Sequence, residues 1–583
     1  MQIREFIRKQ RIRIALGCVT VAAVVSFSFV ADSYFEVSKN LDIFTTLFRD
    51  VNMYYVDSIQ PGELMKKGMD GMLKSLDPYT VYIPESDIED YRMTHISAEY
   101  GGIGALVMQR DGAIIISEVY EGFPAQKSGL LVGDEIISVN GTLVKDRKVD
   151  DVSSLLKGQK GIPLKIAVKR EGVATLVEKQ ITRDEIKFPN VPYFGMIDEH
   201  TGYIKLNQFL ENSSDEVRTA LITLKQNAGM KQVILDLRGN GGGLLKDAVE
   251  IVNIFVEQGQ KIVSQKGKIR EMNVEYLAQK TPVDKEIPVV VLVDRGSASA
   301  SEIVTGAMQE LDRGVIIGQR TFGKGLVQQT YNLSYNTLLK VTIAKYYTPS
   351  GRCIQALDYT HRNADGSVER VSDSLISEYK TRNGRLVYDG SGIFPDIYME
   401  KKNYSNVSIA LGSNYIYYDY AGEFYQKHPS IPAAREFSLT PAEYDHFVGF
   451  VDGKKYEYTD KTERMMDELK KTAEKEKNFD AIKPEFEALK TKLQIDKNQD
   501  IKSHREEIKE LLENEIVSRY YYQKGRIESG FKYDKEIARA VEVLNDKALY
   551  SSILKGDGAY KVIGKPGSDA QAKANSEDND SEE

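Results

Sequence analysis

Two apolar runs constrain the fold of this chain more than any other feature of its sequence. Residues 233–237 and 289–293 consist of valine, isoleucine and leucine, interrupted only by Asp236. Strands that are covered on both faces have this composition, whereas strands with one wet face alternate polar and apolar residues. Apolar residues recur at helical spacing over residues 244–256 and again over 300–311. Alternating strands and helices predict a layered α/β core with partly parallel strands.

Changes of composition along the chain indicate further regions beside this core, which we place at residues 184–400. Short helical patterns fill residues 32–93, and short β-rich runs separated by glycines fill residues 94–183. Residues 401–566 are mostly helical in pattern. Residues 567–583 are polar and acidic, and such a composition buries too little apolar surface to fold.

The first 31 residues have the pattern of a membrane anchor or a signal peptide. A basic head precedes a stretch of apolar or small residues over 14–31, which reaches the minimum length of a membrane-spanning helix. Because a basic head stays in the cytoplasm, the pattern predicts that the chain is anchored in the inner membrane and that the remainder lies on the periplasmic side of the cell envelope. A cleaved signal is the alternative, since residues 26–28 offer a weak cleavage site.

The net charge and the numbers of cysteines and histidines argue against several classes of function. Lysine and arginine number 78 against 86 aspartates and glutamates, a net charge of −8, so no basic surface for nucleic acid is indicated. The two cysteines, Cys18 and Cys353, show no disulfide or metal-binding pattern, and the six histidines have no ligand spacing. A metal-based mechanism therefore has no support in the sequence.

The second apolar run leads directly into a turn of small residues, 294–302, with the sequence Asp-Arg-Gly-Ser-Ala-Ser-Ala-Ser-Glu. A strand that turns sharply into a helix exposes a side chain at the end of the sheet, as in hydrolases with a nucleophilic serine. The helix N-terminus also stabilises developing negative charge. The alternative is a capping box made by Ser299 and Glu302. The spacing does not distinguish Ser297, Ser299 and Ser301 as nucleophiles.

Two glycine-rich stretches are further candidates for chemistry. Lys324 lies between two glycines, and a lysine acts as a base only where burial or a cationic neighbour keeps it neutral. An exposed loop lysine is the alternative. Residues 236–243 lie between a strand and a helix but lack the lysine and hydroxyl residue of a phosphate-binding loop. Their N–H groups indicate either an oxyanion hole or a tight turn.

Together these three stretches resemble the carboxyl-terminal processing, or tail-specific, serine proteases. The resemblance covers residues 35–400 and implies a ClpP/crotonase-like protease core. It implies that Ser299 is the nucleophile, Lys324 the general base and Gln328 the third member of a triad. The alternative catalytic arrangement is a Ser-His-Asp site that uses a distant histidine such as His200.

The resemblance also implies an oxyanion hole. Its donors would be the N–H groups of Ala300 and Gly243, with Gly242 as a neighbour. Gln328 has the weakest physical support, because four residues along a strand span about 13 Å. Contact between Gln328 and Lys324 would therefore need a helical turn, which the flanking glycines permit.

Residues 94–183 resemble a PDZ domain inserted before the core, most clearly over 129–141. The resemblance implies that one loop binds a peptide's terminal carboxylate and that the strand over 103–108 accepts the peptide by β-augmentation. The opposite wall is expected on a helix at about 150–156. A glycine-rich β-domain without a ligand is the alternative. The implied carboxylate loop consists of Tyr100, Gly101, Gly102, Ile103 and Gly104.

The resemblance therefore implies a serine endopeptidase of the cell envelope that uses a Ser-Lys dyad and no cofactor. Its partners would be unfolded or C-terminally exposed polypeptides whose free C-termini bind the PDZ domain. A homo-oligomer and an adaptor protein are both compatible with this pattern. The rival interpretation is a catalytically inactive, membrane-anchored scaffold that binds peptides through the PDZ domain alone.

Overall fold

The computed structural model describes residues 34–96, 99–363, 366–452, 454, 456, 458, 461–493, 497–558 and 564–568. These residues form two compact units. One contains the described residues up to Pro84 together with Thr330–Val341, and the other contains the remaining described residues. The second unit holds the layered α/β core, a β-rich domain and a helical domain, as the sequence predicts.

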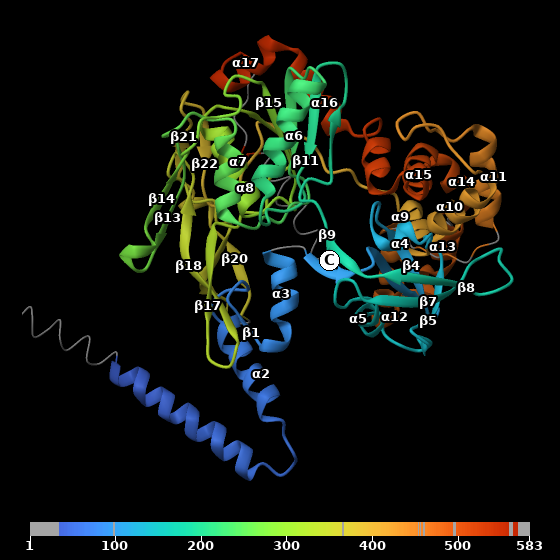
Figure 1. Ribbon diagram of the computed structural model, residues 1–583, viewed down its shortest axis with the longest axis horizontal. Coiled ribbons are helices and arrows are strands. Elements are labelled where there is room, and N and C mark those ends of the chain that lie inside the picture. Colours follow the sequence, from blue (N-terminus) through green and yellow to red (C-terminus); the bar gives the residue numbers. More distant parts are fainter. Residues whose placement is uncertain are drawn as a thin grey trace, which may run out of the picture. The chain divides into compact units, whose positions relative to one another are not determined.

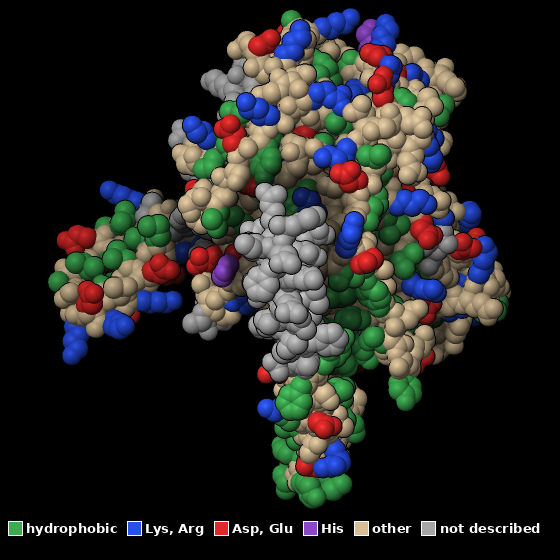
Figure 2. Space-filling view, turned by 90° about the vertical axis from the view of Figure 1, so that its left-hand side faces the viewer, with side chains coloured by type: hydrophobic (Ala, Val, Ile, Leu, Met, Phe, Trp, Pro, Cys, Tyr) green, Lys and Arg blue, Asp and Glu red, His purple; other side chains and the backbone are tan. Residues whose placement is uncertain are grey.

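The first unit begins with a helix over residues 34–54. It continues with α2 (Pro61–Lys74) and β1 (Val81–Ile83), which pairs antiparallel with the start of β18 (Leu338–Tyr347). The first helix exposes many hydrophobic side chains, among them Tyr34 and Phe35. Figure 2 shows hydrophobic side chains gathered on the segment at its lower end.

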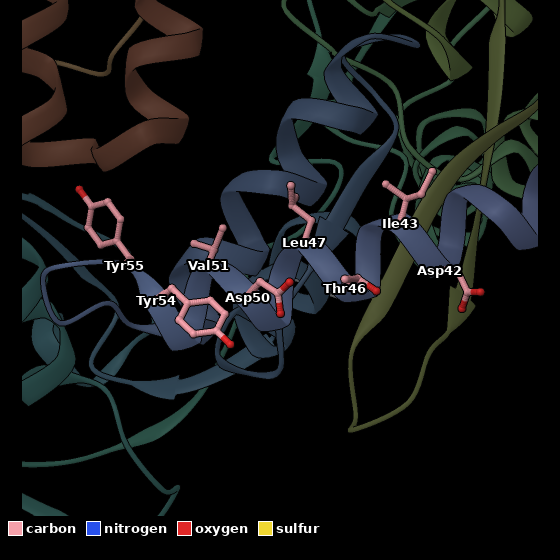
Figure 3. A pocket seen from close by; sticks show the side chains of 8 residues that line it. All are labelled: Asp42, Ile43, Thr46, Leu47, Asp50, Val51, Tyr54 and Tyr55. Carbon is pink, nitrogen blue, oxygen red and sulfur yellow. The ribbon is translucent and has the colours of Figure 1, made fainter.

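A pocket runs along this first helix and is far in sequence from the serine turn. Figure 3 shows Ile43 towards one end of it and two tyrosines at the other. It is lined by Asp42, Ile43, Thr46, Leu47, Asp50, Val51, Tyr54 and Tyr55.

The main sheet of the second unit has the order β10-β11-β12-β15-β16-β23. All neighbours are parallel except β10 and β11, which confirms the expected parallel core. Every residue of β12 and β15 is buried, as their apolar sequences predict. The strands are β10 (Tyr193–Met196), β11 (Thr201–Lys205), β12 (Gln232–Asp236), β15 (Val289–Val293), β16 (Val315–Gly318) and β23 (Ile397–Tyr398).

Helices cover this sheet on both faces (Figure 1). Successive side chains of a strand point to opposite faces. Accordingly, Val289, Val291 and Val293 pack with the helices of one face, and Val290 and Leu292 pack with those of the other. The first face carries α6 (Ser213–Asn227), α7 (Leu245–Asn253) and α8 (Ala300–Glu310), and the second carries α16 (Lys535–Asn545) and α17 (Lys547–Lys555). Helices from the C-terminal region therefore complete the core.

The β-rich domain is a sheet of order β3-β4-β5-β7-β8 with β6 added to β5, and β2 pairs separately with β9. Its core includes Ile114, Ile136 and Val168. Its elements are β2 (Glu99–Gly102), β3 (Ala105–Arg110), β4 (Ala113–Val119), α4 (Pro124–Lys127), β5 (Glu135–Val139), β6 (Thr142–Leu143), α5 (Val149–Leu156), β7 (Pro163–Lys169), β8 (Val177–Thr182) and β9 (Asp184–Lys187), preceded by α3 (Ile88–His95).

Smaller sheets and a helical domain complete the second unit. Strand β18 pairs with β17 (Leu326–Asn332) and with β13 (Lys261–Gly267), which pairs with β14 (Val274–Leu277). Two hairpins follow, β19 (Leu357–Arg362) with β20 (Val368–Arg370) and β21 (Glu378–Lys380) with β22 (Leu386–Tyr388). The helical domain contains α9 (Asn406–Ser413), α10 (Ile416–Lys427), α11 (Pro441–Asp452), α12 (Lys461–Lys475), α13 (Phe479–Leu493), α14 (Lys497–Ser503) and α15 (Arg505–Gly530).

Within the described ranges, no helix combines the length and the apolar content that crossing a bilayer requires. The anchor expected over residues 14–31 lies outside the described residues, as does the tail from 569 onwards.

Candidate active site at a strand-to-helix turn

The turn after β15 holds Ser299 in an unusual backbone conformation. Its φ is 55° and its ψ is −110°, a combination that L-residues rarely adopt. Strained residues of this kind occur at functional sites, where the surrounding structure holds them in place. Ser299 immediately precedes α8 and is partly exposed. The geometry is that of a nucleophile on a strand-to-helix turn.

The other two serines of the turn are used as structural ties. The hydroxyl of Ser297 is buried and donates to the carbonyl of Leu237 at 2.9 Å. The hydroxyl of Ser301 is buried as well and donates to the carbonyl of Asn240 at 2.8 Å. Both bonds join the serine turn to the glycine-rich loop after β12. Of the three serines, Ser299 is therefore the one that is not buried.

A buried carboxylate connects the serine turn with the loop over residues 319–325, which we call the lysine loop because it contains Lys324. One oxygen of Glu302 accepts the hydroxyl of Thr321 at 2.6 Å and the N–H of Gly323 at 2.7 Å. The other accepts the N–H of Ser299 at 2.8 Å and the N–H of Lys324 at 2.9 Å. Burial raises the pKa of Glu302 to about 7, against the opposing effect of these four hydrogen bonds.

Glu302 thus extends the capping box that the sequence indicated. The sequence analysis treated this residue only as a helix cap. The three donors from the lysine loop could not be foreseen, because nothing in the local pattern places that loop beside α8.

The lysine loop packs closely against Gln355 and Ala356 on the two sides of Lys324. A Cβ added to Gly323, whose φ is 90°, would lie 2.5 Å from the Cβ of Ala356. One added to Gly325 would lie 2.8 Å from the backbone nitrogen of Gln355. The glycines are therefore needed for this close packing, and Lys324 itself is half-buried.

The glycine-rich loop lies against the serine turn. A Cβ added to Gly242 would lie 2.8 Å from the Cβ of Ser299 and 2.9 Å from the nitrogen of Ala300. The N–H of Gly242 donates to the side-chain oxygen of Asn240 at 2.9 Å. By contrast, no hydrogen bond among the described residues uses the N–H of Ala300 or of Gly243. Two of the three implied oxyanion donors are thus free, and that of Gly242 is engaged.

The structure places Gln328 on a strand and not on a helical turn. It is part of β17, and its amide donates to the hydroxyl of Thr342 on β18 at 3.1 Å. The helical turn needed to bring Gln328 to Lys324 is therefore not formed, because pairing with β18 extends the chain from Leu326 onwards.

The implied carboxylate loop of the β-rich domain is tightly packed. Its first residue, Tyr100, is half-buried, and Gly101 lies so close to the backbone that an added Cβ would be 1.9 Å from the carbonyl oxygen of Gly158. Ile103 is buried in the core of the domain. At Gly104, φ is 73° and an added Cβ would meet Phe123. A similar addition at Gly102 would lie 2.6 Å from the Tyr100 ring.

Strand β3 has the free edge that peptide addition requires. In the part of the chain that the structure describes, β3 pairs with β4 alone. Helix α5 lies beside β3. On this helix Val152 and Leu156 are buried in the core of the domain, and Leu155 is half-buried. The 3.6-residue repeat turns the first two residues inwards.

His200 and Ser299 lie at opposite ends of the parallel strands: His200 at their N-terminal end and Ser299 at their C-terminal end. His200 immediately precedes β11, which runs parallel to β12 and β15, whereas Ser299 follows the end of β15. The length of β15 alone separates the two by roughly 15 Å. A Ser-His-Asp arrangement with His200 is therefore wrong for this fold.

Comparisons with known proteins agree with this organisation. The family model of peptidase family S41 matches residues 200–361, that of the PDZ domain matches 115–170, and that of the C-terminal helical domain of probable PDZ-proteases matches 407–544. The carboxy-terminal-processing protease of Bartonella bacilliformis is 33% identical over 340 residues, which cover 58% of this chain and 77% of that relative. The chain belongs to the carboxy-terminal-processing proteases.

Two further proteins illustrate the relationship. The carboxy-terminal processing protease CtpA of Bacillus subtilis is 35% identical over 317 residues, covering 54% of this chain and 67% of the relative. Among solved structures, the photosystem II D1 C-terminal processing protease is 26% identical, covers 61% of this chain and 92% of its own, and has a TM-score of 0.33. As a member of the carboxy-terminal-processing proteases, this protein is a serine-type peptidase with a PDZ domain.

Proposed function

We propose that this carboxy-terminal-processing protease cleaves polypeptides with a Ser-Lys dyad formed by Ser299 and Lys324. The observation that carries the proposal is the strained, partly exposed Ser299 between two serines whose hydroxyls are already bonded. The carboxylate of Glu302 supports the pairing, because it binds the N–H groups of both dyad residues.

In this mechanism the neutral amine of Lys324 takes the proton of the Ser299 hydroxyl as its oxygen attacks the scissile carbonyl carbon. The N–H groups of Ala300 and Gly243 bind the resulting oxyanion, since both are free. Collapse of the intermediate breaks the C–N bond, and the amine leaves with the proton from Lys324. Water then hydrolyses the acyl-enzyme, with Lys324 again acting as the base. Gln328 joins this unit only if substrate rearranges its bond to Thr342.

We further propose that the PDZ domain recognises the free C-terminus of the substrate. The open edge of β3 supports this role, because an extended peptide can add there as a further strand. The loop from Tyr100 to Gly104 leads into that strand and would hold the terminal carboxylate. Unfolded or C-terminally exposed polypeptides are the substrates that fit such a site.

The third proposal concerns location. The basic head and the apolar stretch over residues 14–31 support an inner-membrane anchor with the protease on the periplasmic side of the envelope. Cleavage of this segment would leave the same enzyme soluble in the envelope.

The test of the dyad uses unfolded casein as substrate. Ser299→Ala should abolish cleavage without changing the melting temperature by more than a few degrees. Ser301→Ala removes one buried hydrogen bond, which costs about 1 kcal/mol of stability. Ser297→Ala removes the bond to Leu237 and also the contacts with Asp294, so it should cost more. Both variants should retain activity. Cleavage by Ser299→Ala at the wild-type rate would contradict the proposal. Wild-type protein that binds peptides but never cleaves them would favour the inactive scaffold.

A further inference from the structure

The glycine-rich loop of the candidate site is attached to the C-terminal helix α16 by an arginine. Arg238 is the second residue after β12, and its guanidinium donates to Glu536 at 2.6 Å and lies 2.8 Å from the carboxylate of Asp534. Asp534 caps α16, and Glu536 lies in its first turn. The two ends of this contact are 298 positions apart in the sequence.

The contact is part of a mostly buried cluster of charges. The guanidinium of Arg238 also binds Asp236, the last residue of β12, whose side chain is 1% exposed. Lys205 donates to the same carboxylate and to the carbonyl of Arg238 at 2.6 Å. Burial alone would lower the pKa of Arg238, but the charge of Asp236 raises it well above its usual value. Arg238 is therefore a charged link between Asp236 on one side and the carboxylates of Asp534 and Glu536 on the other.

A continuous set of hydrogen bonds leads from Arg238 to the serine turn. The next residue, Gly239, donates its N–H to Asp294 at 2.8 Å. Asn240 accepts the N–H of Gly242 through its side chain and the N–H of Ala298 through its carbonyl, at 2.9 and 3.0 Å. Arg238 thus stands at the start of the loop, and these bonds join the loop to the serine turn beside Ser299.

The ionic contact is separate from the apolar packing of α16. The helix covers the sheet with Ile537, Ala540, Val543 and Leu544. Those residues account for its attachment to the core, so attachment does not require Asp534 and Glu536 to face Arg238. Burial raises the pKa of Glu536, against the opposing effect of the neighbouring Arg238.

We infer that Asp534 and Glu536 are positioning residues for the oxyanion hole, acting through Arg238 on the N–H of Gly243. The C-terminal helix then contributes to catalysis as well as to the fold. This inference rests on the proposed function, in which Gly243 is an oxyanion donor.

The test compares steady-state kinetics of Asp534→Asn, Glu536→Gln and the double variant with wild-type protein on one peptide substrate. Asparagine caps a helix as well as aspartate, so α16 should stay folded. Loss of a whole oxyanion donor costs about 10²–10³ in kcat, and a displaced donor should cost less, about 10- to 100-fold. KM should change by less than about two-fold, because the donor acts on the transition state.

The matched control is Glu542→Gln, which breaks the exposed pair of Glu542 with Arg539 on the same helix. It should keep the wild-type kcat. A peptide aldehyde gives a second readout, since its hemiacetal with Ser299 places an oxyanion in the hole. Its affinity for Glu536→Gln should fall by the same factor as kcat.

A double variant with unchanged kcat and a lower melting temperature would overturn the inference and leave a structural role. If the double variant fails to fold, Glu536→Gln alone decides the question by the same two readouts. Measuring Ser299→Ala in the same assay distinguishes failure of the proposed function from failure of this inference. Activity in Ser299→Ala would overturn the proposed function, whereas an inactive Ser299→Ala with wild-type kcat in both single variants would overturn this inference alone.

Discussion

The backbone N–H of Lys324 donates a hydrogen bond of 2.9 Å to the carboxylate of Glu302. The same oxygen accepts the N–H of Ser299. One buried side chain therefore sets the separation of the two segments that carry the proposed dyad. Hydrogen bonds to a buried carboxylate are among the strong ones in proteins, so this geometry resists displacement.

Glu302→Gln should impair catalysis. The side-chain nitrogen of the glutamine would face N–H donors. The hydrogen bonds on that side of residue 302 would then be lost and replaced by repulsion between donors. Bonds to a charged group are worth about 1.5–3 kcal/mol, and we expect kcat to fall by roughly 10- to 100-fold. Assays on unfolded casein would measure this, with Glu286→Gln as an exposed control. Wild-type kcat in Glu302→Gln would show that the carboxylate does not position the dyad.

The pH dependence of stability should report the burial of Glu302. An acid whose pKa is higher in the folded than in the unfolded chain takes up a proton on folding between the two values. Because burial raises this pKa from 4.5 to about 7, the stabilising contribution is complete below pH 4.5 and is lost as the pH rises through 7. The free energy of unfolding of wild type relative to Glu302→Gln should decrease by about 3 kcal/mol over that interval.

Urea titrations at pH 4.5 and pH 7.5 would measure this difference. A difference that does not vary with pH would mean that Glu302 titrates normally.

Lys324→Arg should be as inactive as Lys324→Ala. A guanidinium stays protonated in proteins and cannot take the proton of Ser299. Because nucleophile and base act as one unit, we expect kcat to fall by roughly 10⁴-fold or more in either variant. Lys285→Arg changes an exposed lysine and serves as the control. Substantial turnover by Lys324→Arg would exclude a lysine base.

Binding at the PDZ domain should require a free C-terminal carboxylate. Amidation removes the charge and presents an N–H to donors, which should weaken binding by about 1–3 kcal/mol. Fluorescence anisotropy with Ser299→Ala protein would compare two peptides that differ only in a free or an amidated terminus. Equal affinities would assign the domain another role. Substitution of Gly102 is unsuitable, because a side chain there would collide with Tyr100.

The full chain should partition with membranes, whereas a chain without residues 1–31 should not. The apolar stretch over 14–31 is the reason, since it reaches the length of a membrane-spanning helix. Fractionation after expression in a Gram-negative host would measure both. N-terminal sequencing of the full chain that began near Phe29 would indicate a cleaved signal.

Local patterns in the sequence were sufficient to predict the layered core and the serine turn. The apolar run over 289–293 and the small residues after it act within one short segment, so sequence predicts them. The partners of Glu302 could not be predicted, because Thr321 and Lys324 reach it only through the fold. Pairing with β18 also overrode the helical turn considered for Gln328, since strand pairing is a long-range effect.

The cover that α16 and α17 give to the second face of the sheet has a consequence for biosynthesis. A ribosome delivers the strands and α6, α7 and α8 long before these two helices. Until they emerge, Ile234, Val290 and Leu292 remain uncovered in the nascent chain, and Arg238 has no Glu536 to bind. Incomplete chains with an exposed apolar sheet aggregate or are held by chaperones. The sheet of the protease core is therefore covered on both faces only once α16 and α17 have been made.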